Sequence, residues 1–119
     1  MPLHLTPSVL EAAYLYLRAT EPFRTWRLPE GEDVTFRITN SVHYLGTHRR
    51  SRLGHPIITV SMHRVGHTET LLCTIAHEIC HLVQARDGTE TKGTIHNAEF
   101  YKLAKRVCNR HGWDAKEFV

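Results

Sequence analysis

The sequence is short of cysteine, and its three cysteines form no familiar pattern. Cys73, Cys80 and Cys108 include no C-x-x-C pair, which excludes a zinc knuckle made of four cysteines. An odd number of cysteines without framework spacing is typical of free thiols in a reducing compartment. We therefore expect an intracellular, cytoplasmic protein without structural disulfides.

A long apolar run is also missing. The apolar stretch from Val9 to Leu17 is interrupted by Glu11, whereas a membrane-spanning helix needs about 20 mostly apolar residues. A signal peptide needs a charged segment followed by an unbroken apolar one, and the sequence shows neither. We therefore expect no signal peptide and no membrane partner.

No internal repeat, low-complexity tract or linker interrupts the 119 residues. This length is typical of one domain, and a chain of this size buries roughly two-thirds of its unfolded surface, enough for one modest core. We therefore expect residues 1–119 to form a single domain, and we expect that domain to be a monomer.

Histidine is the residue present in excess, since the chain contains ten. Most of these histidines have no spacing typical of metal ligands, and buried or exposed packing is the expected role of such residues. The set without ligand spacing comprises His43, His48, His55, His63, His67 and His111.

Periodicity predicts both helices and strands, and hence an α+β fold. Thr6-Pro7 is typical of a helix start, and we expect that helix to continue to about Thr20. A period of two from Val34 to Ile38 predicts a half-buried strand, with residues 42–47 as its partner across a turn. Residues 57–62 form the clearest strand by their β-branched content. The basic segment that precedes this last strand is expected to be a loop.

Two further helices are expected in the C-terminal half. One should run from about Glu69 to Arg86, because a glutamate and an arginine suit the two ends of a helix dipole. The other should run from about Asn97 to His111 and end at Gly112. Residues 87–94 contain two glycines and are expected to form the loop between these helices.

The sequence H-E-I-C-H at residues 77–81 falls within the first of these two helices. At a spacing of four residues, His77 and His81 lie on one helix face and one turn apart, where two imidazoles can bind the same metal ion. Glu78 stands beside them, where a carboxylate can take a proton from water on the metal. The apolar residues of the helix recur at three- and four-residue steps on the opposite face. These apolar residues are Leu72, Ile75, Ile79 and Leu82.

A catalytic zinc site needs a third protein ligand and one open position. The metzincin pattern would place glycine at 84 and histidine at 87, so Gln84 and Asp87 exclude that class. Asp87, His96 and Glu99 are within reach, because the ten residues from Asp87 to His96 can span about 33 Å. On the residues alone His96 is favoured over Glu99, but Glu99 remains open as the ligand of a thermolysin-like site.

The run H-E-I-C-H-L-V-Q, followed after a loop by H-N-A-E-F-Y-K-L, resembles the SprT-like metalloprotease domain, a family that includes Spartan. The family shows H-E-x-x-H followed by H-G-x-E-F, and the similarity covers residues 34–112. It departs at Asn97, where the family usually has glycine. The resemblance implies a zincin-like fold, with a small sheet packed against the HExxH helix and flanking helices. It also implies one Zn²⁺ per chain, bound by His77, His81 and His96.

The resemblance further implies a peptidase with a protein substrate, in which Glu78 is the general base. As in zincin proteases, the strand 57–62 is then expected to be an exposed edge that pairs with an extended substrate. Spartan-like members act on proteins crosslinked to DNA. In a chain with net charge +3, weak nucleic-acid binding through phosphates is expected at Arg49, Arg50 and Arg52.

Two alternatives follow from the same residues. A regulatory protease of the ImmA/IrrE type also uses H-E-x-x-H, but the downstream H-N-A-E-F fits its E-A-x-x-F-A pattern poorly. A zinc-stabilised, non-catalytic DNA-binding module would also need the histidines. That module predicts that Glu78 is dispensable and that removal of the metal unfolds the chain.

Overall fold

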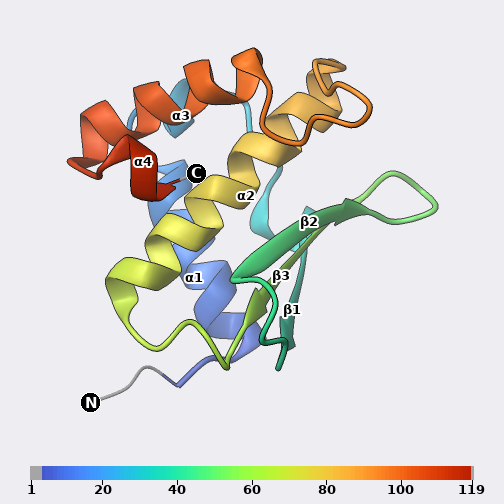
Figure 1. Ribbon diagram of the computed structural model, residues 1–119. Helices are drawn as coiled ribbons and strands as arrows, with labels where there is room; N and C mark the ends of the chain where they lie inside the picture. The colour runs from blue at the N-terminus through green and yellow to red at the C-terminus, as the bar shows by residue number, and fades with distance from the viewer. Residues whose placement is uncertain (1–3, 119) are drawn as a thin grey trace.

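The longest element of the molecule is a 20-residue helix, α2 (Thr68–Asp87). The structure is a computed structural model that describes residues 4–118. In it α2 lies between a three-stranded sheet and α3 (Ala98–His111), while α1 (Pro7–Arg18) packs against both α2 and the sheet (Figure 1). The α+β class expected from the sequence is confirmed. No helix in residues 4–118 is long and apolar enough to cross a membrane.

The helix ends follow from local chemistry, and they agree with the sequence predictions within about two residues. The hydroxyl of Thr6 accepts a hydrogen bond from the Val9 amide at 3.2 Å and caps α1. Gly88 ends α2 and Gly112 ends α3, both in the left-handed conformation that favours glycine. Two short 3₁₀ turns follow α1, and a last short helix, α4 (Ala115–Phe118), ends the described chain.

The sheet has the order β1-β3-β2, and this order corrects three predictions. β3 (Pro56–Ser61) is the central strand, parallel to β1 (Thr35–Thr39) and antiparallel to β2 (Gly46–Arg50). Hence residues 42–47 do not pair with β1, β3 is not an exposed edge, and part of the expected basic loop is strand β2. β3 takes the centre because it carries the buried apolar side chains, whereas the polar β2 suits an edge.

One face of the sheet packs against the helices. Ile58 and Val60 of β3 are fully buried, and their partners in register on β2 are His48 and Gly46. Residues directly opposite each other in a sheet share a face. His48 and Gly46 therefore lie on the helix-covered face, on the side of the sheet where α2 crosses.

The edge strand comes unusually close to α2 at Gly46. A Cβ atom added there would lie 2.8 Å from Cγ2 of Thr74 and 2.9 Å from the carbonyl oxygen of Thr59. It would also lie 3.4 Å from Oε2 of Glu78. The absence of a side chain at Gly46 therefore sets the distance between β2 and the H-E-I-C-H turn of α2.

We expect Gly46→Ala to lower the free energy of unfolding by about 1–3 kcal/mol, because the added methyl group overpacks the contact between β2 and α2. Urea denaturation of the purified protein measures this change. Gly66→Ala is the matched control, since a Cβ atom at Gly66 has no neighbour within 4 Å. Equal free energies of unfolding for the two variants would show that the contact between β2 and α2 at Gly46 has room for a methyl group.

Candidate metal centre

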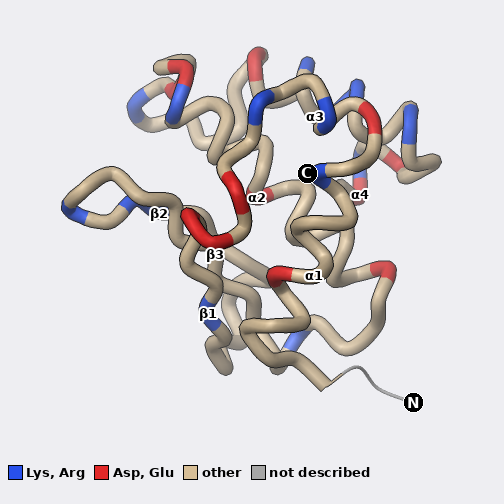
Figure 2. Tube along the Cα trace, turned by 180° about the vertical axis from the view of Figure 1, so that it is seen from behind, with Lys and Arg blue, Asp and Glu red and all other residues tan. Residues whose placement is uncertain are grey.

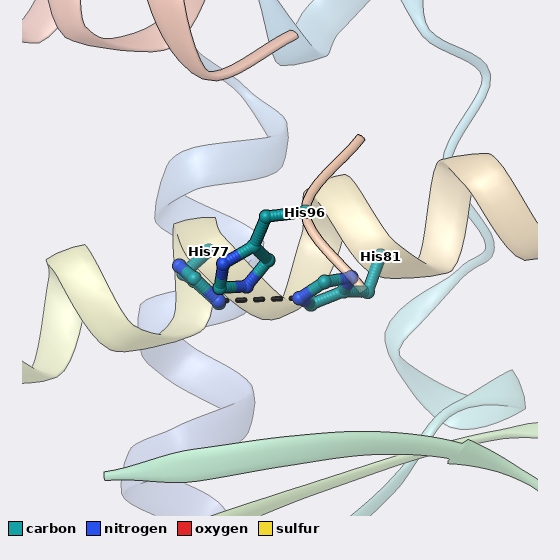
Figure 3. A group of neighbouring side chains, drawn as sticks. All are labelled: His77, His81 and His96. Atoms are coloured by element: carbon teal, nitrogen blue, oxygen red, sulfur yellow. Dashed lines mark hydrogen bonds between the residues drawn. The ribbon is translucent and has the colours of Figure 1, made fainter. Parts of the chain in front are cut away.

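Three histidine side chains meet on one side of α2 (Figure 3). His77 and His81 come from successive turns of α2, and His96 comes from the segment that leads into α3. One ring nitrogen from each histidine lies within 4.8 Å of the other two, and all three residues are partly buried. The structure thus brings together the three histidines predicted from the sequence, and this group could hold a metal ion.

The spacing of the ring nitrogens fits a small metal ion. The Nε2 atoms of His77 and His81 are 3.2 Å apart. Two nitrogens bound tetrahedrally at about 2.0–2.1 Å from one ion lie about 3.3–3.4 Å apart. The pair on α2 therefore needs almost no movement to share an ion, and His96 completes a set of three imidazole donors.

The orientation of His77 is set by the C-terminal part of the described chain. Its Nδ1 donates a hydrogen bond to the carbonyl oxygen of Phe118, in α4, at 2.8 Å. The proton on Nδ1 leaves Nε2 with a free lone pair directed towards His81, as a metal ligand requires. Sequence reasoning missed Phe118, because a backbone carbonyl leaves no mark on the side-chain pattern.

Burial keeps the three histidines neutral. Burial, with smaller contributions from the neighbouring His77 and His96, lowers the pKa of His81 to about 3. Burial also lowers the pKa of His77 and of His96, although the hydrogen bond to Phe118 acts in the opposite direction on His77. Neutral imidazole is the form that binds a metal ion, so the site is electrostatically prepared for one at neutral pH.

Glu78 lies beside the histidines and is largely buried. The residue is only 4% exposed, and no residue within 4–118 donates a hydrogen bond to its carboxylate. Burial raises the pKa of Glu78 to about 8. A nearby cation would favour the ionised form, because the charge of a bound metal ion dominates its local field.

The histidines and Glu78 line a cavity of about 1090 Å³ between β2, α2 and the C-terminal segment. The side chains along this cavity include five carboxyl groups and no lysine or arginine. The cavity is therefore acidic although the chain has net charge +3, so the positive charge must lie elsewhere on the surface. The lining carboxylates are Glu69, Glu78, Glu90, Asp114 and Glu117.

The three arginines expected to bind nucleic acid lie outside this cavity, on the β2–β3 hairpin that projects from the body of the protein (Figure 2). Arg49 and Arg50 are on strand β2 and only Arg52 is in the turn, which corrects the prediction that all three lie in a loop. Successive residues of a strand face opposite sides of the sheet. Arg49 and Arg50 therefore do not form one patch.

The other residues weighed as third ligand are engaged elsewhere. The carboxylate of Glu99 is paired with Lys102 at 3.2 Å on the exposed side of α3. Asp87 is paired with Arg86 at 2.8 Å. Neither belongs to the group formed by the histidines, so the geometry favours His96.

His48 is a cavity residue that sequence reasoning assigned to the surface or to packing. It is half-buried on β2, and its Nε2 atom is buried without a hydrogen-bond partner among residues 4–118. Burial and, to a smaller extent, the charge of Arg50 together lower the pKa of His48 to about 4. Alternation along β2 would have placed His48 on the face of α2, had this polar segment been recognised as a strand.

No protein-family model matches the chain, and no curated protein matches it at a significant level. What the site does must therefore be inferred from its residues and their geometry.

We expect His48 to make the metal-free protein less stable as the pH falls from about 6.5 towards 4. The unfolded chain protonates His48 near pH 6.5, whereas the folded protein does so only near pH 4. Proton uptake therefore favours the unfolded state in this window. Urea denaturation in chelator at several pH values measures the slope.

His48→Gln should make this slope shallower without abolishing it, because the pKa values of the three site histidines are lowered too. His55→Gln changes an exposed histidine in the hairpin turn and is the control. A slope for His48→Gln equal to that of the parent would contradict the buried, neutral state of His48.

Proposed function

We propose that this chain is a zinc-dependent metallopeptidase that hydrolyses peptide bonds. The observation that carries the proposal is the meeting of three histidine nitrogens and one buried carboxylate along a single cleft. Three protein ligands leave one coordination position for water or substrate, as in catalytic zinc sites, whereas structural sites use four. The resemblance of residues 34–112 to SprT-like domains, which implies a zincin-like fold, supports the same function.

Zinc is the metal that we propose, with one ion per chain. Imidazole nitrogen suits zinc, copper, nickel and iron, while calcium and magnesium prefer oxygen. A set of three histidines with an adjacent glutamate in H-E-x-x-H spacing matches the ligand choice of zinc hydrolases. The ligands in this proposal are His77, His81 and His96, and the catalytic carboxylate is that of Glu78.

Each residue of the site has a separate role in the proposed hydrolysis of a peptide bond. Zinc, when bound, lowers the pKa of water in its open position to near 7 and polarises the scissile carbonyl. Glu78 accepts the proton of the attacking water and passes it to the departing amine. The carbonyl of Phe118 holds the ring of His77 in the tautomer that leaves Nε2 free.

The strand that receives the substrate is β2 in this proposal, and not β3 as the sequence led us to expect. β3 is hydrogen-bonded on both sides, whereas β2 is an edge strand, and its first three residues, 46–48, line the cavity. An extended peptide can add to such an edge through main-chain hydrogen bonds. It would then pass the histidines with its carbonyl groups held in fixed register.

Action on proteins associated with DNA stays a prediction from the resemblance. The cleft is lined by carboxylates, so it repels phosphate groups. A nucleic acid is therefore expected at the hairpin that carries Arg49, Arg50 and Arg52. The contact should be independent of sequence and weak, with a dissociation constant of about 10⁻⁴–10⁻⁶ M at physiological salt.

We expect Glu78→Gln to keep its zinc and its fold but to lose proteolysis by at least about 100-fold, because glutamine cannot accept the proton. Cleavage of an unstructured protein such as casein, with metal analysis of the same sample, measures both properties. Glu90→Gln, which changes another carboxylate of the cleft, is the matched control and should remain active. Parental activity in Glu78→Gln would favour a non-catalytic zinc module.

We expect His96→Ala to lower the affinity for zinc by orders of magnitude, because it removes one of three ligands. Glu99→Ala should retain most of the affinity, since the carboxylate of Glu99 faces Lys102 on the exposed side of α3. Competition with a chromogenic chelator measures both constants. The reverse order of affinities would indicate a thermolysin-like site and would remove the basis for the SprT-like assignment.

A further inference from the structure

Two amide side chains connect the helix that carries two of the histidines to the segment that carries the third. Gln84 lies three residues after His81 in α2 and is fully buried. Asn97 directly follows His96 and caps the N-terminus of α3. The Nε2 atom of Gln84 donates a hydrogen bond to Oδ1 of Asn97 at 2.8 Å.

Asn97 also ties down the connection between α2 and α3. Its Nδ2 atom donates to the carbonyl oxygen of Thr89 at 2.9 Å and to the hydroxyl of Thr91 at 2.8 Å. Its Oδ1 atom accepts the amide of Phe100 at 3.0 Å. The side chain of Asn97 thus makes hydrogen bonds at both ends of the segment from residue 88 to residue 97, and Gln84 anchors Asn97 to α2.

Backbone groups fix the orientation of both amides. The Phe100 amide can only donate, so the Asn97 atom that it meets must be oxygen. The carbonyl of Thr89 can only accept, so the other Asn97 atom must be nitrogen. The Gln84 atom that faces Oδ1 of Asn97 must then be nitrogen, and the donor and acceptor roles are consistent throughout.

We propose that Gln84 and Asn97 are a positioning pair that holds His96 at the metal site. The pair also holds one wall of the cleft, because Glu90 and Ile95 line the cavity from the same connection. This inference rests on the metal site of the proposed function, and not on its peptidase chemistry. A third ligand on a ten-residue connection is otherwise free to move, and fixing it in advance lowers the entropy lost when the metal binds.

The packing of His96 supports this role. Its ring stacks on the ring of Phe100 with centroids 4.5 Å apart, and the amide of Phe100 is the group that Asn97 caps. The place of the third ligand therefore depends on where the first turn of α3 begins. Glycine, which SprT-like domains usually have at this position, has no side chain to make any of these bonds, so the pair is a feature of this chain.

One substitution at Gln84 can test the positioning role separately from the stability of the fold. The Oε1 atom of Gln84 is buried without a hydrogen-bond partner among residues 4–118. A buried unsatisfied acceptor destabilises the fold, and methionine, of similar volume, removes that acceptor. Gln84→Met should therefore leave the metal-free protein as stable as the parent or more stable, while it loses the link to Asn97.

The experiment is a Co²⁺ titration followed by the visible absorption of the bound ion, with zinc competition and with thermal unfolding of each protein in chelator. Gln84→Met and Asn97→Gly should each weaken Co²⁺ binding by about 10- to 100-fold. The double variant should lose little more than Asn97→Gly, because the two residues share their strongest link and the other bond of Gln84, to the carbonyl of Thr89, is long at 3.4 Å.

Two further variants complete the design. Asn97→Asp keeps the cap of α3 and the acceptor for Gln84 but cannot donate to Thr89 or Thr91, so it should show intermediate affinity. Lys92→Ala, in the exposed part of the same connection, should bind Co²⁺ like the parent. The unfolding midpoint of Gln84→Met in chelator should equal or exceed that of the parent.

Parental affinity and an unchanged Co²⁺ spectrum in both Gln84→Met and Asn97→Gly would overturn the positioning role while leaving the metal site intact. A parent that binds Co²⁺ and zinc but cleaves no protein would overturn the peptidase function and leave the positioning role to be judged by the same titration. A parent that binds no metal ion would overturn both.

Discussion

The burial of three histidines and a glutamate beside one another is the constraint on which the rest of this structure depends. Three neutral imidazoles face one another across a few ångströms beside a carboxylate that is 4% exposed. Burial lowers the pKa of each of these histidines and raises the pKa of Glu78 to about 8. Burying these groups costs stability in the metal-free chain, and a bound cation would offset part of that cost. A histidine group that could hold a metal ion is therefore the feature around which the others are arranged.

Four separate parts of the chain meet at this site. α2 supplies His77, Glu78 and His81, the connection before α3 supplies His96, and α4 contributes the carbonyl of Phe118. The edge strand β2 approaches closely enough to line the same cleft only because residue 46 is a glycine. Ligand geometry, cleft shape and strand position are thus set together, as expected when the surroundings of a metal ligand hold its orientation.

Features that depend on neighbours in the sequence were predicted well, and those that depend on distant contacts were not. The limits of α2 and α3 follow from caps and helical periodicity, and the spacing of His77 and His81 follows from the helix itself. The pairing of β3 between β1 and β2 is non-local, and a period of two does not identify a strand's neighbours. β2 was read as a loop because its residues are polar. Its histidine, His48, was consequently missed at the cleft.

The most direct test of the zinc site is X-ray absorption at the zinc edge, combined with metal analysis of the purified protein. Binding by His77, His81 and His96 predicts one zinc per chain, with three nitrogen ligands and one oxygen ligand at about 2.0–2.2 Å. Cys73 also lines the cleft, so a sulfur ligand at about 2.3 Å would point to a different site. A zinc content below half an ion per chain, or a sulfur ligand, would contradict the three-histidine centre.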